Sequence, residues 1–180
     1  LRKQWHYYND GTVSSRAMKG ADCNVKPVWE KYTTGKKNVI VAVVDGGIDI
    51  THEDLKDNLY VNEKEKNGQP NVDDDGNGFV DDIYGYNFVT AKDVVGGTIE
   101  PDDGGHGTHV AGTVAARNNN GKGVAGIAGG DGSPDSGVRL LSCQIFRNKD
   151  EQGDAAAAIK YAADNGAVIC QNSWGYSSTA

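Results

Sequence analysis

An apolar run that ends in an acid and two glycines constrains the fold of this chain more than any other feature. Val39–Val44 is apolar throughout, and Asp45-Gly46-Gly47 follows it directly. Apolar runs without polar alternation are typical of strands buried on both faces, as in a parallel sheet. Val138–Phe146 and Ala167–Cys170 have the same character, so each predicts a further buried strand.

Segments with helical signals lie between and around these runs. Val25–Tyr32, with Pro27 in its first turn, and the small-residue run Thr108–Arg117 predict two helices. Asp154–Asn165 predicts a third, because an acid precedes four alanines and Gly166 follows its end. Together with a short strand expected within Ile83–Val89, the pattern predicts an α/β fold, a parallel sheet flanked by helices.

Composition narrows the class of protein. The 180 residues are enough for one domain, and the formal net charge of −7 argues against nucleic acid as a partner. No apolar stretch reaches the roughly 20 residues that span a bilayer, and nothing reads as a signal peptide. Three cysteines form neither a disulfide framework nor a zinc set, and we expect Cys143 and Cys170 to be buried in strands.

The segment Gly105–Ala116 has a histidine, His106, between two glycines. Histidine is the usual proton carrier near neutral pH, and small neighbours let a substrate backbone approach. Asp45 and His106 are candidates for two members of a charge relay, although each alone also fits a turn or loop residue. His109 is three positions further on, whereas metal-binding helices more often place two histidines four apart, so a metal there is disfavoured.

The acidic segment between residues 73 and 82 is a candidate cation site. Five carboxylates in ten residues repel one another unless a cation neutralises them. Oxygen ligands at alternate positions before a glycine are the first half of an EF-hand loop, but the twelfth position holds Tyr84 instead of glutamate. Many flexible ligands favour calcium over magnesium; the alternative is a solvated acidic loop. The candidate ligands are Asp73, Asp75, Asn77, the Phe79 carbonyl, Asp81 and Asp82.

Three segments in order resemble the subtilisin-like serine proteases, or subtilases: Val43–Asp49, His52–Leu55 and His106–Gly112. Val124–Ala128 and Asn172–Gly175 are also similar to segments of that family. The sequence departs from the pattern at Gly46, where the family more often has threonine or serine. The resemblance implies a subtilisin-like fold and a polypeptide substrate. It also implies a protein that is secreted, on the cell surface or in the periplasm.

The resemblance also implies roles for individual residues. Asp45 would be the orienting acid and His106 the general base. Substrate would pair as an added strand with a cleft formed by Ser173, Trp174 and Gly175, with Gly153 in the opposite wall. A second calcium ion would bind Asp54 together with Asn120.

The family's nucleophile lies in a Gly-Thr-Ser-Met-Ala segment, which this sequence does not contain. We therefore expect residues 1–180 to be the N-terminal portion of one catalytic domain, inactive alone and completed by its own C-terminal half. A sheet that ends at Ala167–Cys170 would have an unpaired edge, through which the chain could self-associate. The alternative is a non-catalytic, calcium-stabilised peptide-binding module, but such a module has no need for Asp45 and His106.

Overall fold

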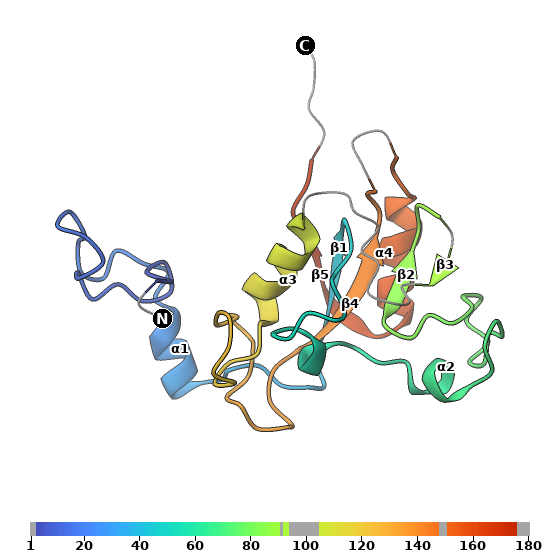
Figure 1. Ribbon diagram of the computed structural model, residues 1–180, viewed down its shortest axis with the longest axis horizontal. Coiled ribbons are helices and arrows are strands. Elements are labelled where there is room, and N and C mark those ends of the chain that lie inside the picture. Colours follow the sequence, from blue (N-terminus) through green and yellow to red (C-terminus); the bar gives the residue numbers. More distant parts are fainter. Residues whose placement is uncertain (1–2, 91, 94–104, 148–150, 176–180) are drawn as a thin grey trace, which may run out of the picture.

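A computed structural model describes residues 3–90, 92–93, 105–147 and 151–175 (Figure 1). Within these residues, five strands form one sheet in the order β3-β2-β4-β1-β5. The pairs β2–β4, β4–β1 and β1–β5 are parallel, and only β2–β3 is antiparallel. The strands are β1 (Ile40–Asp45), β2 (Gly85–Asn87), β3 (Lys92–Asp93), β4 (Arg139–Gln144) and β5 (Ala167–Asn172).

Helices cover both faces of this sheet, as predicted for an α/β fold. Figure 1 shows α3 and α4 on opposite sides of the central strands. Alternate residues of β1 divide between the two layers: Val41 and Val43 pack against α3, whereas Ala42 and Val44 pack against α4. The helices are α1 (Val25–Lys31), the 3-10 turn η1 (Lys56–Asn58), α2 (Glu63–Asn67), α3 (His106–Ala115) and α4 (Ala155–Asp164).

Both long helices have ends that the sequence explains. The Asp154 side chain accepts a hydrogen bond from Ala157 N at 2.9 Å, and Gly166 has a φ of 83° just past the end of α4. In contrast, α3 begins at His106, two residues before the predicted start, and its N-cap Gly105 has a φ of 85°. The left-handed backbone conformation of Gly105 turns the chain into α3, so that His106 is the first residue of the helix.

The last strand differs from its prediction. β5 lies at the edge of the sheet among the described residues, as expected of a sheet that ends there, but it is not buried, and Val168 is 70% exposed. Cys170 is exposed for the same reason, so the prediction that it is buried is wrong, whereas Cys143 in the central β4 is buried as expected. An apolar run fixes which residues form a strand, but it does not fix how many neighbours that strand has.

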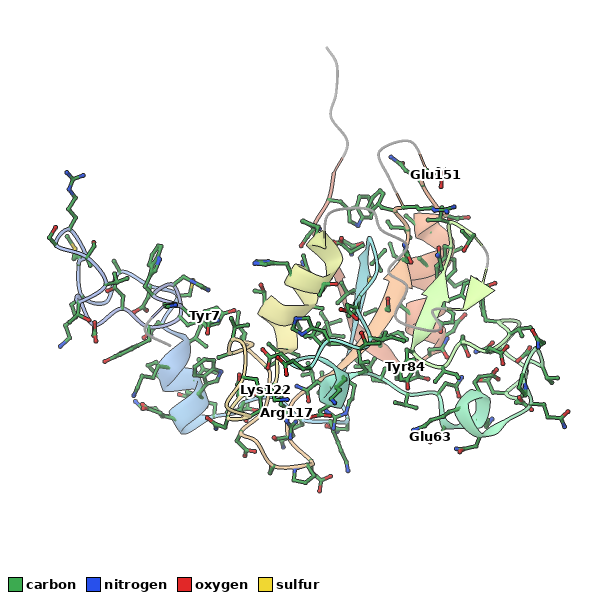
Figure 2. The ribbon with its side chains drawn as sticks, viewed as in Figure 1. Tyr7, Glu63, Tyr84, Arg117, Lys122 and Glu151 are labelled. Atoms are coloured by element: carbon green, nitrogen blue, oxygen red, sulfur yellow. The ribbon has the colours of Figure 1, made fainter. Side chains whose placement is uncertain are left out.

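The N-terminal segment packs on the loop that follows α3, at one side of the molecule (Figures 1 and 2). Trp29 Nε1 donates to Ile127 O at 2.7 Å, and the Gln4 amide exchanges two hydrogen bonds with the Ala125 backbone. Among the described residues, no helix has the length and apolar character needed to cross a membrane.

Candidate active site

Asp45 and His106 meet although 61 positions separate them. Asp45 is the last residue of the central strand β1, and His106 begins α3, which packs on that strand. His106 Nδ1 lies 2.8 Å from Asp45 Oδ1, and the same oxygen accepts a hydrogen bond from Gly46 N at 2.7 Å. The Asp45 side chain is 2% exposed and that of His106 49% exposed. A buried acid thus holds an imidazole that is about half exposed.

Glycines beside the pair allow this approach. A Cβ atom on Gly107 would lie 2.3 Å from Gly47 O and 3.2 Å from Asp45 Oδ1. Gly107 is therefore required by internal packing of α3 against the loop after β1, whereas the sequence suggested that it makes room for substrate. A Cβ atom on Gly105 would meet nothing within 4 Å, and its φ of +85° is the reason for glycine there.

The predicted substrate-binding residues gather near one small cavity beyond the ends of β1 and β4. Trp174 Nε1 donates to Val44 O at 2.8 Å, and its ring lies edge-on to Phe146 at 5.7 Å. Gly153 packs so closely on Phe88 that a Cβ atom would lie 2.6 Å from the Phe88 carbonyl carbon. Ser173 is exposed and accepts a hydrogen bond from Gln171 Nε2. The cavity is lined by Ile145, Phe146, Gln152, Gly153, Ala155, Trp174 and Gly175.

The acidic segment contributes two carboxylates to a cluster, and a third comes from a residue that sequence reasoning missed. Glu65 of α2, Asp75 and Asp82 each offer an oxygen, and these three atoms lie within 4.8 Å of one another. Glu65 is only 3% exposed. Its carboxylate accepts from the backbone N–H groups of Asp74, Asp75 and Asp81, so it forms the floor of the loop. In the sequence Glu65 lies in the charged run Glu63–Lys66, where nothing distinguishes it from its neighbours.

The other predicted ligands of this loop have different contacts. Asp73 accepts from the N–H groups of residues 76, 77 and 78, and Asp81 accepts from Asn71 N. Asn77 donates its amide to both Asp75 and Asp82, while the Phe79 ring packs edge-on to Tyr86. Asp73 and Asp81 lie outside the three-carboxylate cluster, whereas Asn77 contacts two of its members. Asn77 and the Phe79 carbonyl stay predicted ligands.

Asp82 connects this cluster to α4. It is fully buried, and its Oδ2 accepts a hydrogen bond from Tyr161 OH at 2.7 Å. Asn62 donates its amide to Asp75 and Asp82 at 2.8 and 2.9 Å. Burial raises the pKa of Asp82, hydrogen bonds from Tyr161, Asn77 and Asn62 oppose this rise, and the nearby Asp75 carboxylate adds to it. A cation between the carboxylates would relieve this cost.

The residues predicted for a second ion are also brought together. Asn120 Nδ2 donates to Asp54 Oδ1 at 2.6 Å, and Val124 N donates to Asp54 Oδ2 at 2.8 Å. Both oxygens of this buried carboxylate thus already have protein donors. The subtilase resemblance also implies that His109 is a packed helix residue, but its side chain is exposed. Within the described part of the chain it belongs to no group of converging metal ligands.

Comparisons with known proteins identify the family of the chain. Residues 36–180 match the profile of the Subtilase family. Subtilisin-like protease 1 of Plasmodium vivax is 49% identical over 139 residues, which cover 76% of this chain and 20% of that protein. The cell wall-associated protease of Bacillus subtilis is 31% identical over 176 residues, which cover 96% of this chain and 16% of that protein.

A solved structure supports the fold. The crystal structure of fervidolysin from Fervidobacterium pennivorans, a keratinolytic enzyme related to subtilisin, matches with a TM-score of 0.54 and 30% sequence identity. The match covers 84% of this chain and 19% of that one, so the chain spans about a fifth of the length of these relatives. The family match includes both β1, with Asp45, and α3, with His106, and it extends over most of the sequence. The chain belongs to the subtilase family.

Proposed function

We propose that this chain is the part of a subtilisin-like serine endopeptidase that supplies the acid and the base of an Asp–His–Ser triad. The observation that carries the proposal is the 2.8 Å contact between Asp45 Oδ1 and His106 Nδ1, formed where β1 ends and α3 begins. A buried carboxylate beside a half-exposed imidazole is an arrangement suited to general-base catalysis.

The chemistry follows from the two side chains. Asp45 accepts Nδ1–H and thereby fixes the tautomer in which Nε2 is the acceptor. Nε2 of His106 then takes the proton of a serine hydroxyl as that oxygen attacks the peptide carbonyl, and later returns it to the leaving amine. Asp45 stabilises the imidazolium formed between these steps. The serine belongs to a part of the protein outside the 180 residues, so the chain alone is inactive.

A polypeptide is the proposed substrate. Its extended backbone would pair with Ser173–Gly175, after β5, as an added strand. Trp174 and Gly153 both line the cavity beside this segment, which supports their assignment to one cleft. Trp174 is held in place by its hydrogen bond to Val44 O, and Gly153 by its close packing on Phe88.

We also propose that the acidic loop binds calcium structurally. Three converging carboxylates fit a hard divalent cation, because calcium takes oxygen ligands from flexible loops. Glu65, Asp75 and Asp82 would hold the ion, which when bound supplies positive charge between them. Asp54 and Asn120 remain a second predicted site, with less support, because both Asp54 oxygens already accept hydrogen bonds.

The location and the partner are further parts of the proposal. One relative is by name a cell wall-associated protease, which supports a secreted, cell-surface or periplasmic location for this protein. The exposed edge of β5 supports pairing with the protein's own C-terminal half. The same edge would let the separate 180-residue chain self-associate.

A serine-directed fluorophosphonate probe tests the catalytic proposal. We expect the full-length protein to be labelled, because the probe reacts with a serine that a histidine activates. The 180-residue chain should not be labelled, and His106→Ala in the full-length protein should lower kcat by on the order of 10⁴. Labelling of the short chain would contradict the missing nucleophile, and near-normal turnover of the variant would contradict the role of His106.

A non-catalytic peptide-binding module is the second candidate. It is favoured only by the absence of a family-type nucleophile segment from the sequence. The two proposals differ in one result, because a binding module would leave the full-length protein unlabelled by the probe while it still bound peptides.

A further inference from the structure

Asp45 and Gln144 lie side by side under the start of α3. They are register partners at the ends of the neighbouring parallel strands β1 and β4. Side chains alternate along a strand, and the faces of both strands are known from their packing against α3, which involves Val41, Val43 and Leu140. Asp45 and Gln144 continue these rows, so both side chains belong to the face that α3 covers.

Each of the two buried side chains has one oxygen that lacks a hydrogen-bond partner among the described residues. These atoms are Asp45 Oδ2 and Gln144 Oε1, on side chains that are 2% and 0% exposed. A buried polar atom without a partner is costly, and in native proteins such atoms almost always have one. The two unpartnered oxygens therefore call for a donor near the catalytic acid proposed above.

The donor cannot be the Gln144 amide itself. Gln144 Nε2 donates to Phe146 O at 3.0 Å, and turning the amide over would set its oxygen against that carbonyl. Gln144 Oε1 thus stays an acceptor. Asp45 Oδ1 accepts from Gly46 N and lies 2.8 Å from His106 Nδ1. As the acceptor of Nδ1–H in the proposed triad, Asp45 is a carboxylate, which has no proton to give.

Asp45 Oδ2 and Gln144 Oε1 are both acceptors, so a molecule that donates one hydrogen to each would satisfy the two atoms. Water does so, and it fits a polar site with several partners. Gly47 has no side chain to crowd Gln144, since a Cβ atom there would lie only 3.1 Å from Oε1. We propose that Gln144 is a positioning residue for Asp45, acting through one buried water that donates to Asp45 Oδ2 and Gln144 Oε1.

This arrangement would fix the plane of the catalytic carboxylate from both sides. His106 and Gly46 hold Oδ1, and the water anchored by Gln144 holds Oδ2. Gln144 would act on catalysis through Asp45, by holding this water. The inference rests on the proposed function for its kinetic consequence, but not for its structural one.

Two variants of the full-length protein test the inference. Gln144→Met keeps the length of the side chain and removes the acceptor. Ser142→Ala is the matched control, since Ser142 lies on the same strand and face, is fully buried, and has an unpartnered hydroxyl. We expect Gln144→Met to lower kcat about tenfold with KM changed less than about twofold, because the lost contact orients the acid in the transition state. Ser142→Ala should change neither.

Two structural readouts accompany the kinetics. The wild-type crystal structure at atomic resolution should show a water about 2.8 Å from both oxygens. The low-field proton resonance of His106 Nδ1–H should move in Gln144→Met and stay in Ser142→Ala. A direct short contact between the two oxygens would mean a protonated Asp45 and overturn the inference, as would unchanged kcat in a folded Gln144→Met. If the wild-type protein hydrolyses no peptide, the proposed function fails, while the water and the resonance still decide this inference.

Discussion

Local geometry leaves no room for a side chain at Gly107. Its position in α3 faces the loop after β1, and a Cβ atom there would lie 2.3 Å from Gly47 O, a backbone atom that cannot simply turn aside. Any side chain would push the start of α3 away from β1. Because His106 precedes it directly, the contact with Asp45 would lengthen.

We expect Gly107→Ala to lower the free energy of unfolding by about 1–3 kcal/mol, the usual cost of overpacking, and to reduce kcat in the full-length protein. Gly112→Ala is the control in the same helix, because its Cβ atom would meet nothing within 4 Å. It should be neutral or stabilise by about 0.4–1 kcal/mol. Urea denaturation of both variants checks this, and equal stabilities would contradict the packing argument.

At this scale, sequence alone identified the residues that carry a strong local pattern. Asp45 after an apolar run and His106 between glycines could be read as candidates, and the structure brings them together. Glu65 could not be found, because nothing in its neighbourhood distinguishes it from the other charges of α2. Its role depends on the loop of residues 73–82 folding back over it, which is a tertiary event.

The acidic loop and α2 act as one element. Glu65 holds the backbone of the loop, and its carboxylate converges with those of Asp75 and Asp82. Without a cation, three nearby negative charges oppose one another. The proposed calcium ion would stabilise the fold by mass action, because the unfolded chain does not hold the three carboxylates together.

Glu65→Gln should therefore reduce the rise in Tm that calcium produces. Glu63→Gln is the matched control: it removes the same charge from the same helix, but Glu63 is exposed at the margin of the molecule (Figure 2). Thermal unfolding of both variants, with calcium and with EDTA, separates the two effects. If EDTA leaves the wild-type Tm unchanged, the loop holds no stabilising ion.

Elements with clear end signals were predictable, and short ones were not. The acid before α4 and the glycine after it fix that helix closely, and the apolar run fixes β1. α2 and η1 have five and three residues, too few for a periodic pattern to emerge. The five residues of α2 are held by the Asn62 cap and by contacts with the acidic loop, which sequence periodicity does not report.

At the scale of the whole molecule, the β5 edge of the sheet exposes apolar side chains. β5 pairs with β1 on one side, and Val168 and Ile169 are 70% and 51% exposed. Unpaired edges with apolar residues invite another strand. The matched relatives are about four to five times as long as the chain, so they have ample sequence to cover such an edge.

Cysteine reactivity measures whether the edge is covered. Cys170 is exposed on β5, Cys143 is buried in β4, and Cys23 is exposed in the N-terminal segment. Burial also raises the pKa of Cys143, so its thiolate is scarce. In the 180-residue chain, iodoacetamide should therefore modify Cys23 and Cys170 and spare Cys143.

In the full-length protein, iodoacetamide should modify Cys170 at a rate lower by about tenfold or more. A thiol on a covered strand reacts only when that part of the structure opens locally. Cys23 should react at the same rate in both and serves as the internal reference. Mass spectrometry of the modified peptides gives the three rates separately. Equal labelling of Cys170 in the short and long proteins would show that the remainder of the chain leaves β5 uncovered, and the proposed pairing with the C-terminal half would then be wrong.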